Sequence, residues 1–213
     1  MDAPNPLPLV NMLLSSLTQQ VNGNPSKITS SSSSNNHSDD NHHSRSKLLC
    51  AIYTYGDNKK KVKAIAETWG CRCDGFFAAS TETVDDPLEI GLKQIDLPHK
   101  GPEEYENLWM KIRSIFAYMY DHYLDDFDFY FLSGDDAHVI VENSRRVLDS
   151  TIMDETTTAT TKNDALLYLG HWIPCLNKKY YFCGGGAGYV LNRVALRILV
   201  RDLFPNYFPH MRS

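Results

Sequence analysis

The chain has 213 residues, of which 42% are hydrophobic, and its formal net charge is -5. This length and apolar content suit one α/β domain with an additional tail. The negative net charge argues against a nucleic-acid partner, because domains that bind a phosphate backbone are usually basic. No apolar run approaches the ~20 residues that a membrane-spanning helix needs. The most apolar early stretch, residues 6–17, is interrupted by Pro8 and Asn11 and lacks a basic leader, so we expect no signal or transmembrane segment in this chain.

Residues 1–46 are expected to form a disordered tail or stem, and residues 47–213 the folded domain. Ser, Asn, His and Asp dominate from Ser26 to Ser46, and such a segment cannot offset its ordering entropy. The five cysteines, at positions 50, 71, 73, 175 and 183, form no zinc-ribbon pattern. A secretory location would allow two disulfides and a cytosolic one would leave all thiols reduced, so composition leaves both states open.

The first half of the folded part alternates between strands and helices. Apolar runs predict strands at 48–54, 76–80, 92–97 and 127–132. Apolar residues at spacings of three and four predict a helix after residue 58, capped by Asp57 or Asn58, and a second from Glu103 to about Tyr123. This order argues for a mainly parallel sheet with helices on its faces. The lysines at positions 59, 60, 61 and 63 are either solvated charge or a cationic lip beside a phosphate site.

The second half predicts a short helix, a strand, a glycine-rich loop and a closing helix. The helix is expected at 142–150 with Val147 and Leu148 inward, the strand at 165–170, and an exposed insertion at 151–164. Residues 184–188 hold four glycines in five positions, so the backbone there is expected to pass close to other backbone or to a ligand. The closing helix is expected at 192–204, with Val194, Ile198 and Leu199 inward.

Two adjacent carboxylates, Asp135 and Asp136, follow the apolar strand that ends near Leu132. Placing two acids there costs desolvation unless a positive charge compensates them. Ligands of open α/β sheets bind at the carboxyl ends of strands, and a divalent cation that carries a phosphate ligand would suit this position. An ordinary polar turn is the alternative, because Gly-Asp-Asp is common turn chemistry.

Six segments, in this order and spacing, resemble those of a known family. They are Leu48-Leu49-Cys50 with Thr54, Glu67-Thr68-Trp69 with Arg72-Cys73, Asn107 to Lys111, His122 to Phe129, Gly134-Asp135-Asp136, and Gly185 to Leu191. Together they resemble the Fringe-like β-1,3-glycosyltransferases, especially the core 1 N-acetylgalactosaminide β-1,3-galactosyltransferases, over about residues 47–202. The resemblance implies an α/β fold of the GT-A (Rossmann-like) type, with its C-terminal part incomplete in this chain.

The resemblance also implies a site for a uridine diphosphate sugar and Mn²⁺, or Mg²⁺ in its place. Asp136 corresponds to the direct metal ligand and Asp135 to the acid near ribose and metal, whereas Gly134 stands where the family has a third acid. The donor-binding residues implied are Thr54, Lys111, Asp135, Gly185 and Gly186. Trp69 and Trp109 are expected to brace this pocket, and Cys50 is expected to be bonded to Cys73.

The activity implied is inverting transfer of a hexose, galactose by resemblance, to an O-linked or other glycan through a β-1,3 linkage. A carboxylate base must take the proton of the acceptor hydroxyl. The family places this base beyond the position of Ser213, so no catalytic residue is assigned, His210 is not assigned to the metal, and we expect this chain alone to transfer sugar poorly. The alternative is a non-catalytic or chaperone-like relative. The resemblance further implies a Golgi or secretory-pathway membrane and a glycoprotein or glycan acceptor, and it allows a homodimer.

Overall fold

The computed structural model describes residues 45–80, 94–97, 101–154, 166–175 and 180–207. These residues belong to one compact unit that begins at Arg45. The predictions for the tail up to residue 44, for the early apolar stretch, for most of the insertion and for His210 lie outside the described residues. In the described part, no helix is long and apolar enough to span a membrane.

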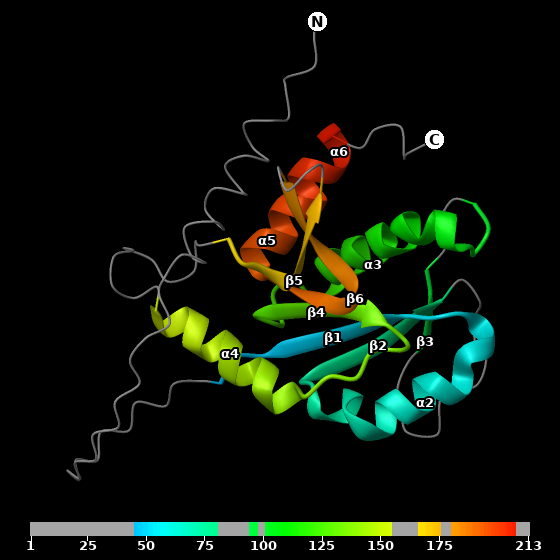
Figure 1. Cartoon of the computed structure of the whole chain (residues 1–213), viewed down its shortest axis with the longest axis horizontal. Helices are drawn as coiled ribbons and strands as arrows, with labels where there is room; N and C mark the ends of the chain where they lie inside the picture. Colours follow the sequence, from blue (N-terminus) through cyan, green and yellow to red (C-terminus); the bar gives the residue numbers. More distant parts are fainter. Residues whose placement is uncertain (1–44, 81–93, 98–100, 155–165, 176–179, 208–213) are drawn as a thin grey trace, which may run out of the picture. The chain divides into compact units, whose positions relative to one another are not determined.

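Six strands of the described residues form one mixed sheet in the order β3-β2-β1-β4-β6-β5 (Figure 1). The parallel strands are β1 (Leu48–Tyr53), β2 (Gly75–Ser80), β3 (Gln94–Asp96) and β4 (Phe129–Gly134). Strand β6 (Tyr180–Asn192) runs antiparallel to β4 and to the edge strand β5 (Tyr168–Cys175). The predicted α/β, Rossmann-like fold is confirmed, with a parallel core and an antiparallel side that the alternation did not reveal.

Helices cover both faces of this sheet (Figure 1). Helices α3 (Leu108–Tyr123) and α5 (Arg193–Arg197) pack on one face, and α2 (Lys59–Thr68) and α4 (Val141–Asp154) pack on the other. Successive strand residues point to opposite faces. Leu49 and Ala51 therefore join the α3 side, whereas Leu48, Cys50 and Ile52 join the α2 side. Burial on both faces explains why the sequences of β1 and β4 are continuous apolar runs.

Three helix predictions need correction. Helix α3 begins at Leu108 rather than Glu103, because a separate 3-10 turn, η3 (Tyr105–Asn107), precedes it. In α4, Leu148 is buried, but Val147 is 55% exposed, because Leu148 lies two helical turns after the buried Val141. The closing helix is divided into α5, the π-helix η5 (Ile198–Leu203) and α6 (Phe204–Tyr207).

The buried side of the closing helix also differs from the prediction. The Asn192 side chain accepts a hydrogen bond of 2.9 Å from the backbone N–H of Ala195 and so caps α5. Because α5 begins directly after Asn192, its buried face carries Ala195 and Leu196, whereas Val194 and Ile198 are only half-buried. Leu199 packs against the core from the side, as predicted.

The predicted glycine-rich loop is a bulge inside β6. Along β5 the register passes from Gly170, opposite Tyr189, directly to His171, opposite Gly184. Residues 185–188 therefore have no partner on β5, although they continue the strand. Gly188 has φ of 75°, and a Cβ there would lie 2.5 Å from the Phe131 ring, so close packing and backbone conformation both require glycine at this position. Bulges of this kind are frequent beside functional sites.

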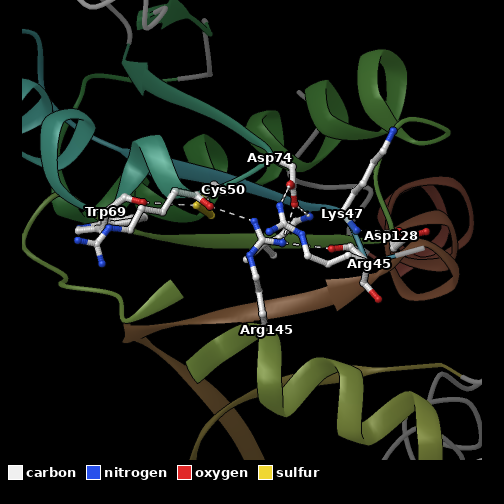
Figure 2. Close-up of polar contacts among 11 residues, drawn as sticks. Arg45, Lys47, Cys50, Trp69, Asp74, Asp128 and Arg145 are labelled. Atoms are coloured by element: carbon white, nitrogen blue, oxygen red, sulfur yellow. Dashed lines mark hydrogen bonds and ion pairs between the residues drawn. A yellow bond between two sulfur atoms is a disulfide. The ribbon is translucent and has the colours of Figure 1, made fainter. Parts of the chain in front are cut away.

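The amino ends of β1 and β2 are held by a polar network around Asp74, the residue before β2 (Figure 2). Its carboxylate accepts hydrogen bonds from Arg45 at 2.6 Å, from Arg145 of α4 at 2.7 Å and from the backbone N–H of Leu48 at 2.7 Å. A disulfide joins Cys50 to Cys73 with Cα atoms 6.1 Å apart, as the resemblance implied. Among the described cysteines, Cys71 is an exposed free thiol and Cys183 a buried one.

Candidate functional site

Strands β1 and β4 end side by side, with Tyr53 directly opposite Gly134 in the register. The residues that follow, Thr54 and Asp135, therefore meet at the carboxyl edge of the sheet. A pocket of about 210 Å³ opens there. Its lining comes from the ends of β1 and β4 and from the start of α3: Tyr53, Thr54, Tyr55, Glu104, Tyr105, Asn107, Leu108, Lys111, Gly134, Asp135 and Asp136.

Asp135 is tied to the segment that follows β1. Its Oδ2 atom accepts hydrogen bonds of 2.7 Å from both the Thr54 hydroxyl and the Asn58 side-chain amide. Its Oδ1 atom lies 3.3 Å from the ammonium nitrogen of Lys61. Asn58 thus binds Asp135 instead of capping α2, where no side-chain cap is formed. Lys61 is the one member of the lysine cluster with a described contact to the acid pair, which supports the cationic-lip interpretation for that residue.

Asp136 differs from Asp135, because its carboxylate is exposed on the pocket wall and has no hydrogen-bond donor among the described residues. Tyr53 lies beside it. Burial, followed by the negative charges of Asp136 and Asp135, raises the pKa of the Tyr53 phenol above its ordinary value. The phenol therefore stays neutral at physiological pH. The pocket wall consequently has an open carboxylate next to a neutral hydroxyl.

Lys111 supplies a buried positive charge to the same pocket. Its side chain is 5% exposed, and its ammonium pairs with Glu103, donates to the Thr54 carbonyl and lies 5.1 Å from the centre of the Tyr55 ring. Burial lowers the pKa of Lys111 to about 8, and the charge of Asp135 opposes this effect. An ammonium with this pKa is largely charged at neutral pH, and Glu103 is its anionic partner in the ligand-free protein.

One rim of the pocket was missed by the sequence analysis. Glu104, Tyr105 and Asn107 line it from the turn before α3, and Tyr105 is 82% exposed. The Asn107 side-chain amide donates a hydrogen bond of 2.9 Å to the Pro102 carbonyl and thereby shapes this turn. The loss of apolar spacing before Leu108 was the signal that could have separated this turn from the helix.

The structure brings most of the predicted site residues together. Thr54, Lys111, Asp135 and Asp136 line the pocket. A Cβ at Gly185 would lie 3.7 Å from the Tyr53 hydroxyl, whereas one at Gly186 would meet no described atom within 4 Å. Both glycines lie in the β6 bulge but neither lines the described pocket.

The two tryptophans do not line the pocket either. Trp69 is 2% exposed in the core beside α2, where its ring meets Phe76 and Phe131 edge-on. Trp109 is half-buried and packs edge-on against Phe204 of α6. Both side chains therefore support the core around the site rather than the pocket wall.

The residues present fit a divalent cation that a ligand helps to hold. Within the described ranges, no three His, Cys, Asp or Glu side chains gather as a metal site. Asp136 offers carboxylate oxygens with no described hydrogen bond, whereas Asp135 already has three polar partners. Mg²⁺ and Mn²⁺ accept sites of one or two carboxylates when phosphate oxygens and water complete the coordination. The donor set therefore suits a cation that is bound together with a phosphorylated ligand.

Comparison with known proteins relates the chain to a galactosyltransferase. No family model matches the chain. The chain is similar to the glycoprotein-N-acetylgalactosamine 3-beta-galactosyltransferase 1 of Xenopus laevis, with 30% identity over 169 residues. The matched region is 78% of this chain and 42% of the relative, so the chain spans less than half of that protein's length. The relative's name supports the galactosyltransferase part of the resemblance that the sequence motifs indicate.

Proposed function

We propose that this chain binds a uridine diphosphate sugar as part of a hexosyltransferase that moves galactose to a glycoprotein glycan through a β-1,3 linkage. The observation that carries the proposal is that the open Asp136 carboxylate and the buried Lys111 ammonium line one pocket at the carboxyl ends of β1 and β4. Parallel α/β sheets bind ligands at this edge. The similarity to the galactosyltransferase of Xenopus laevis supports the choice of donor and acceptor.

The predicted site residues have distinct roles in this proposal. Thr54 and Asp135 fix the edge of the pocket through their hydrogen bond, and Lys111 attracts the negative diphosphate. Asp136 is the ligand of Mn²⁺ or Mg²⁺. The bound cation supplies neutralisation of the charge that develops on the leaving diphosphate. Gly185 and Gly186 are proposed to leave room for the donor sugar, since glycine permits a close approach of ligand to backbone.

The disulfide supports a location in the secretory pathway. Disulfides persist in oxidising compartments and are rare in the cytosol. The bond between Cys50 and Cys73 lies within the folded core, since Cys50 is fully buried. The proposed location is therefore the lumen of the secretory pathway, with the Golgi membrane as the compartment that the resemblance implies.

Calorimetric titration of the folded chain with UDP and with UMP, each in the presence of Mn²⁺, tests the donor site. UDP should bind at least about tenfold more tightly, because only UDP offers a second phosphate for charge-assisted contacts. Equal binding of UDP and UMP, or no binding of either, would contradict the proposal. The variant Glu142→Gln is a matched control for the substitution of an acid in the pocket. Glu142 is an exposed acid on α4 that pairs with Arg72 outside the pocket, so its UDP affinity should be unchanged.

The transferase part is tested separately. Release of UDP from UDP-galactose by this chain is expected to be slow, and it should depend on an acceptor glycopeptide that carries N-acetylgalactosamine. Parallel reactions with UDP-glucose and UDP-N-acetylglucosamine identify the sugar. Release that is independent of the acceptor, or equal for all three donors, would contradict the proposed specificity.

A further inference from the structure

We propose that the Tyr53 hydroxyl is a further ligand-binding group of this pocket, which occupies the space of a carboxylate at position 134 and donates a hydrogen bond to the diphosphate of the ligand. This inference rests on the proposed donor-binding function and assigns a role to a residue that the sequence motifs did not indicate. The uridine diphosphate sugar would then be held by the Tyr53 phenol as well as by the acid pair.

The first support is the direct pairing of Tyr53 with Gly134. The two residues are register partners on neighbouring parallel strands, so the Tyr53 side chain and a Cβ built at position 134 would project to the same face of the sheet. A Cβ at position 134 would lie 3.2 Å from both Cε2 and the hydroxyl oxygen of Tyr53, and 2.8 Å from Oδ1 of Asp136. A side chain at this position would therefore meet the Asp136 carboxylate first and the Tyr53 phenol next. Glycine at 134 and tyrosine at 53 are sterically matched.

The second support is the glycine bulge on the other side of the phenol. A Cβ at Gly185 would lie 3.7 Å from the Tyr53 hydroxyl oxygen and 3.8 Å from the Tyr189 ring. The hydroxyl thus lies between two positions without side chains. Tyr53 packs partly against the core on the α3 side, which restrains the ring. The phenol is consequently held in place beside the pocket that Tyr53 and Gly134 line.

The third support is the polar environment of the hydroxyl. Among the described residues, none is hydrogen-bonded to it, although the side chain is half-buried. Half-buried polar groups generally find a partner, in the protein, in water or in a ligand. A phenol can donate as well as accept a hydrogen bond, whereas a carboxylate only accepts. The Tyr53 phenol beside Gly134 therefore offers a donor to a phosphate oxygen without adding a negative charge to the pocket.

The variant Tyr53→Phe tests the hydroxyl alone. Its affinity for UDP in the presence of Mn²⁺ should fall roughly tenfold, because a hydrogen bond to a charged group is lost. The melting temperature of the ligand-free protein should stay unchanged. Tyr181→Phe is the matched control, because Tyr181 is an exposed tyrosine of β6 that does not line the pocket. Unchanged affinity in Tyr53→Phe would overturn this inference while the donor site stands. Failure of the unmodified protein to bind UDP would overturn both.

A second measurement tests the shared space without any ligand. Gly134→Ala should lower the melting temperature in the unmodified protein and lower it less when Tyr53→Ala is also present, because the exposed Asp136 carboxylate can turn away from the added methyl group whereas the packed Tyr53 ring cannot. Such non-additivity is expected for residues that contact each other. An equal loss in both backgrounds would show that Tyr53 does not occupy the space beside residue 134, and would overturn the inference.

Discussion

Aspartate side chains at the two ends of the parallel strands have opposite surroundings. At the amino ends, Asp74 accepts hydrogen bonds from Arg45, Arg145 and the N–H of Leu48. Burial alone would raise the pKa of Asp74, but these hydrogen bonds outweigh it and hold the pKa below its usual value. At the carboxyl ends, Asp136 has no described hydrogen-bond donor. The same side chain is thus neutralised at one end of the sheet and left open at the other.

This difference separates stability from ligand binding. A carboxylate that is already paired within the protein strengthens the fold but has little left to offer a ligand. An open carboxylate near another acid weakens the folded state slightly and gains favourable partners only when a cation binds. The amino end should therefore determine the free energy of unfolding, and the carboxyl end should determine nucleotide affinity. Each prediction below tests this separation.

Removal of the disulfide at the amino end should have the largest effect. The double variant Cys50→Ala with Cys73→Ala opens a link with a sequence separation of 23 residues and should lower the free energy of unfolding by about 3 kcal/mol. Chemical denaturation measures the loss. The folded fraction should bind UDP with unchanged affinity. A loss of UDP affinity without a loss of stability would contradict the separation of the two ends.

Asp74→Asn should have a smaller effect, which depends on pH. Because the pKa of Asp74 is lowered in the folded state, its contribution is present above the unfolded pKa and disappears as the pH falls through the folded value. The variant should be about 1–2 kcal/mol less stable than the unmodified protein at neutral pH. The difference should close in strong acid. A stability difference that stays constant with pH would show that the charge of Asp74 is not what stabilises this end.

The smallest effect is expected from the titration of Lys111. Burial lowers the pKa of Lys111 to about 8, so its ammonium is lost as the pH rises through that value. UDP affinity should therefore fall a few-fold between about pH 7 and about pH 9, since one attractive charge disappears. Over this range Lys111 should not destabilise the ligand-free protein, because the unfolded chain binds this proton more tightly and stability then rises with pH.

Lys111→Arg provides the control for that titration, because arginine stays charged throughout this range. Its UDP affinity should be flat with pH. An equally steep decline in the Lys111→Arg variant would show that another group causes the pH dependence.

Short-range patterns were sufficient to predict the parallel core and the acid pair. The runs at 48–54 and 127–132 are apolar because β1 and β4 are buried on both faces, and the break after Leu132 marks where β4 ends. The pairing of Cys50 with Cys73 did not follow from spacing and came from the family resemblance alone. Local composition and one family pattern thus indicated the fold and the position of the pocket.

The rest depended on contacts between distant residues. Asp135 binds Thr54 and Asn58 across 81 and 77 positions of the chain, so sequence alone did not show that one acid is engaged and the other open. The bulge in β6 results from a change of register against β5, which residues 184–188 do not encode locally. The fit of Tyr53 to Gly134 likewise exists only because β1 and β4 pair in this register.

The most direct test of the central claim is UDP binding with and without Mn²⁺, in the unmodified protein and in Asp136→Asn. Isothermal titration should show that Mn²⁺ increases UDP affinity at least about tenfold in the unmodified protein, because carboxylate and phosphate oxygens together complete the cation site. This gain should be lost in Asp136→Asn, while the melting temperature of the ligand-free protein is unchanged. An equal gain from Mn²⁺ in both proteins, or a large loss of melting temperature in Asp136→Asn, would contradict the assignment of the open carboxylate to ligand binding.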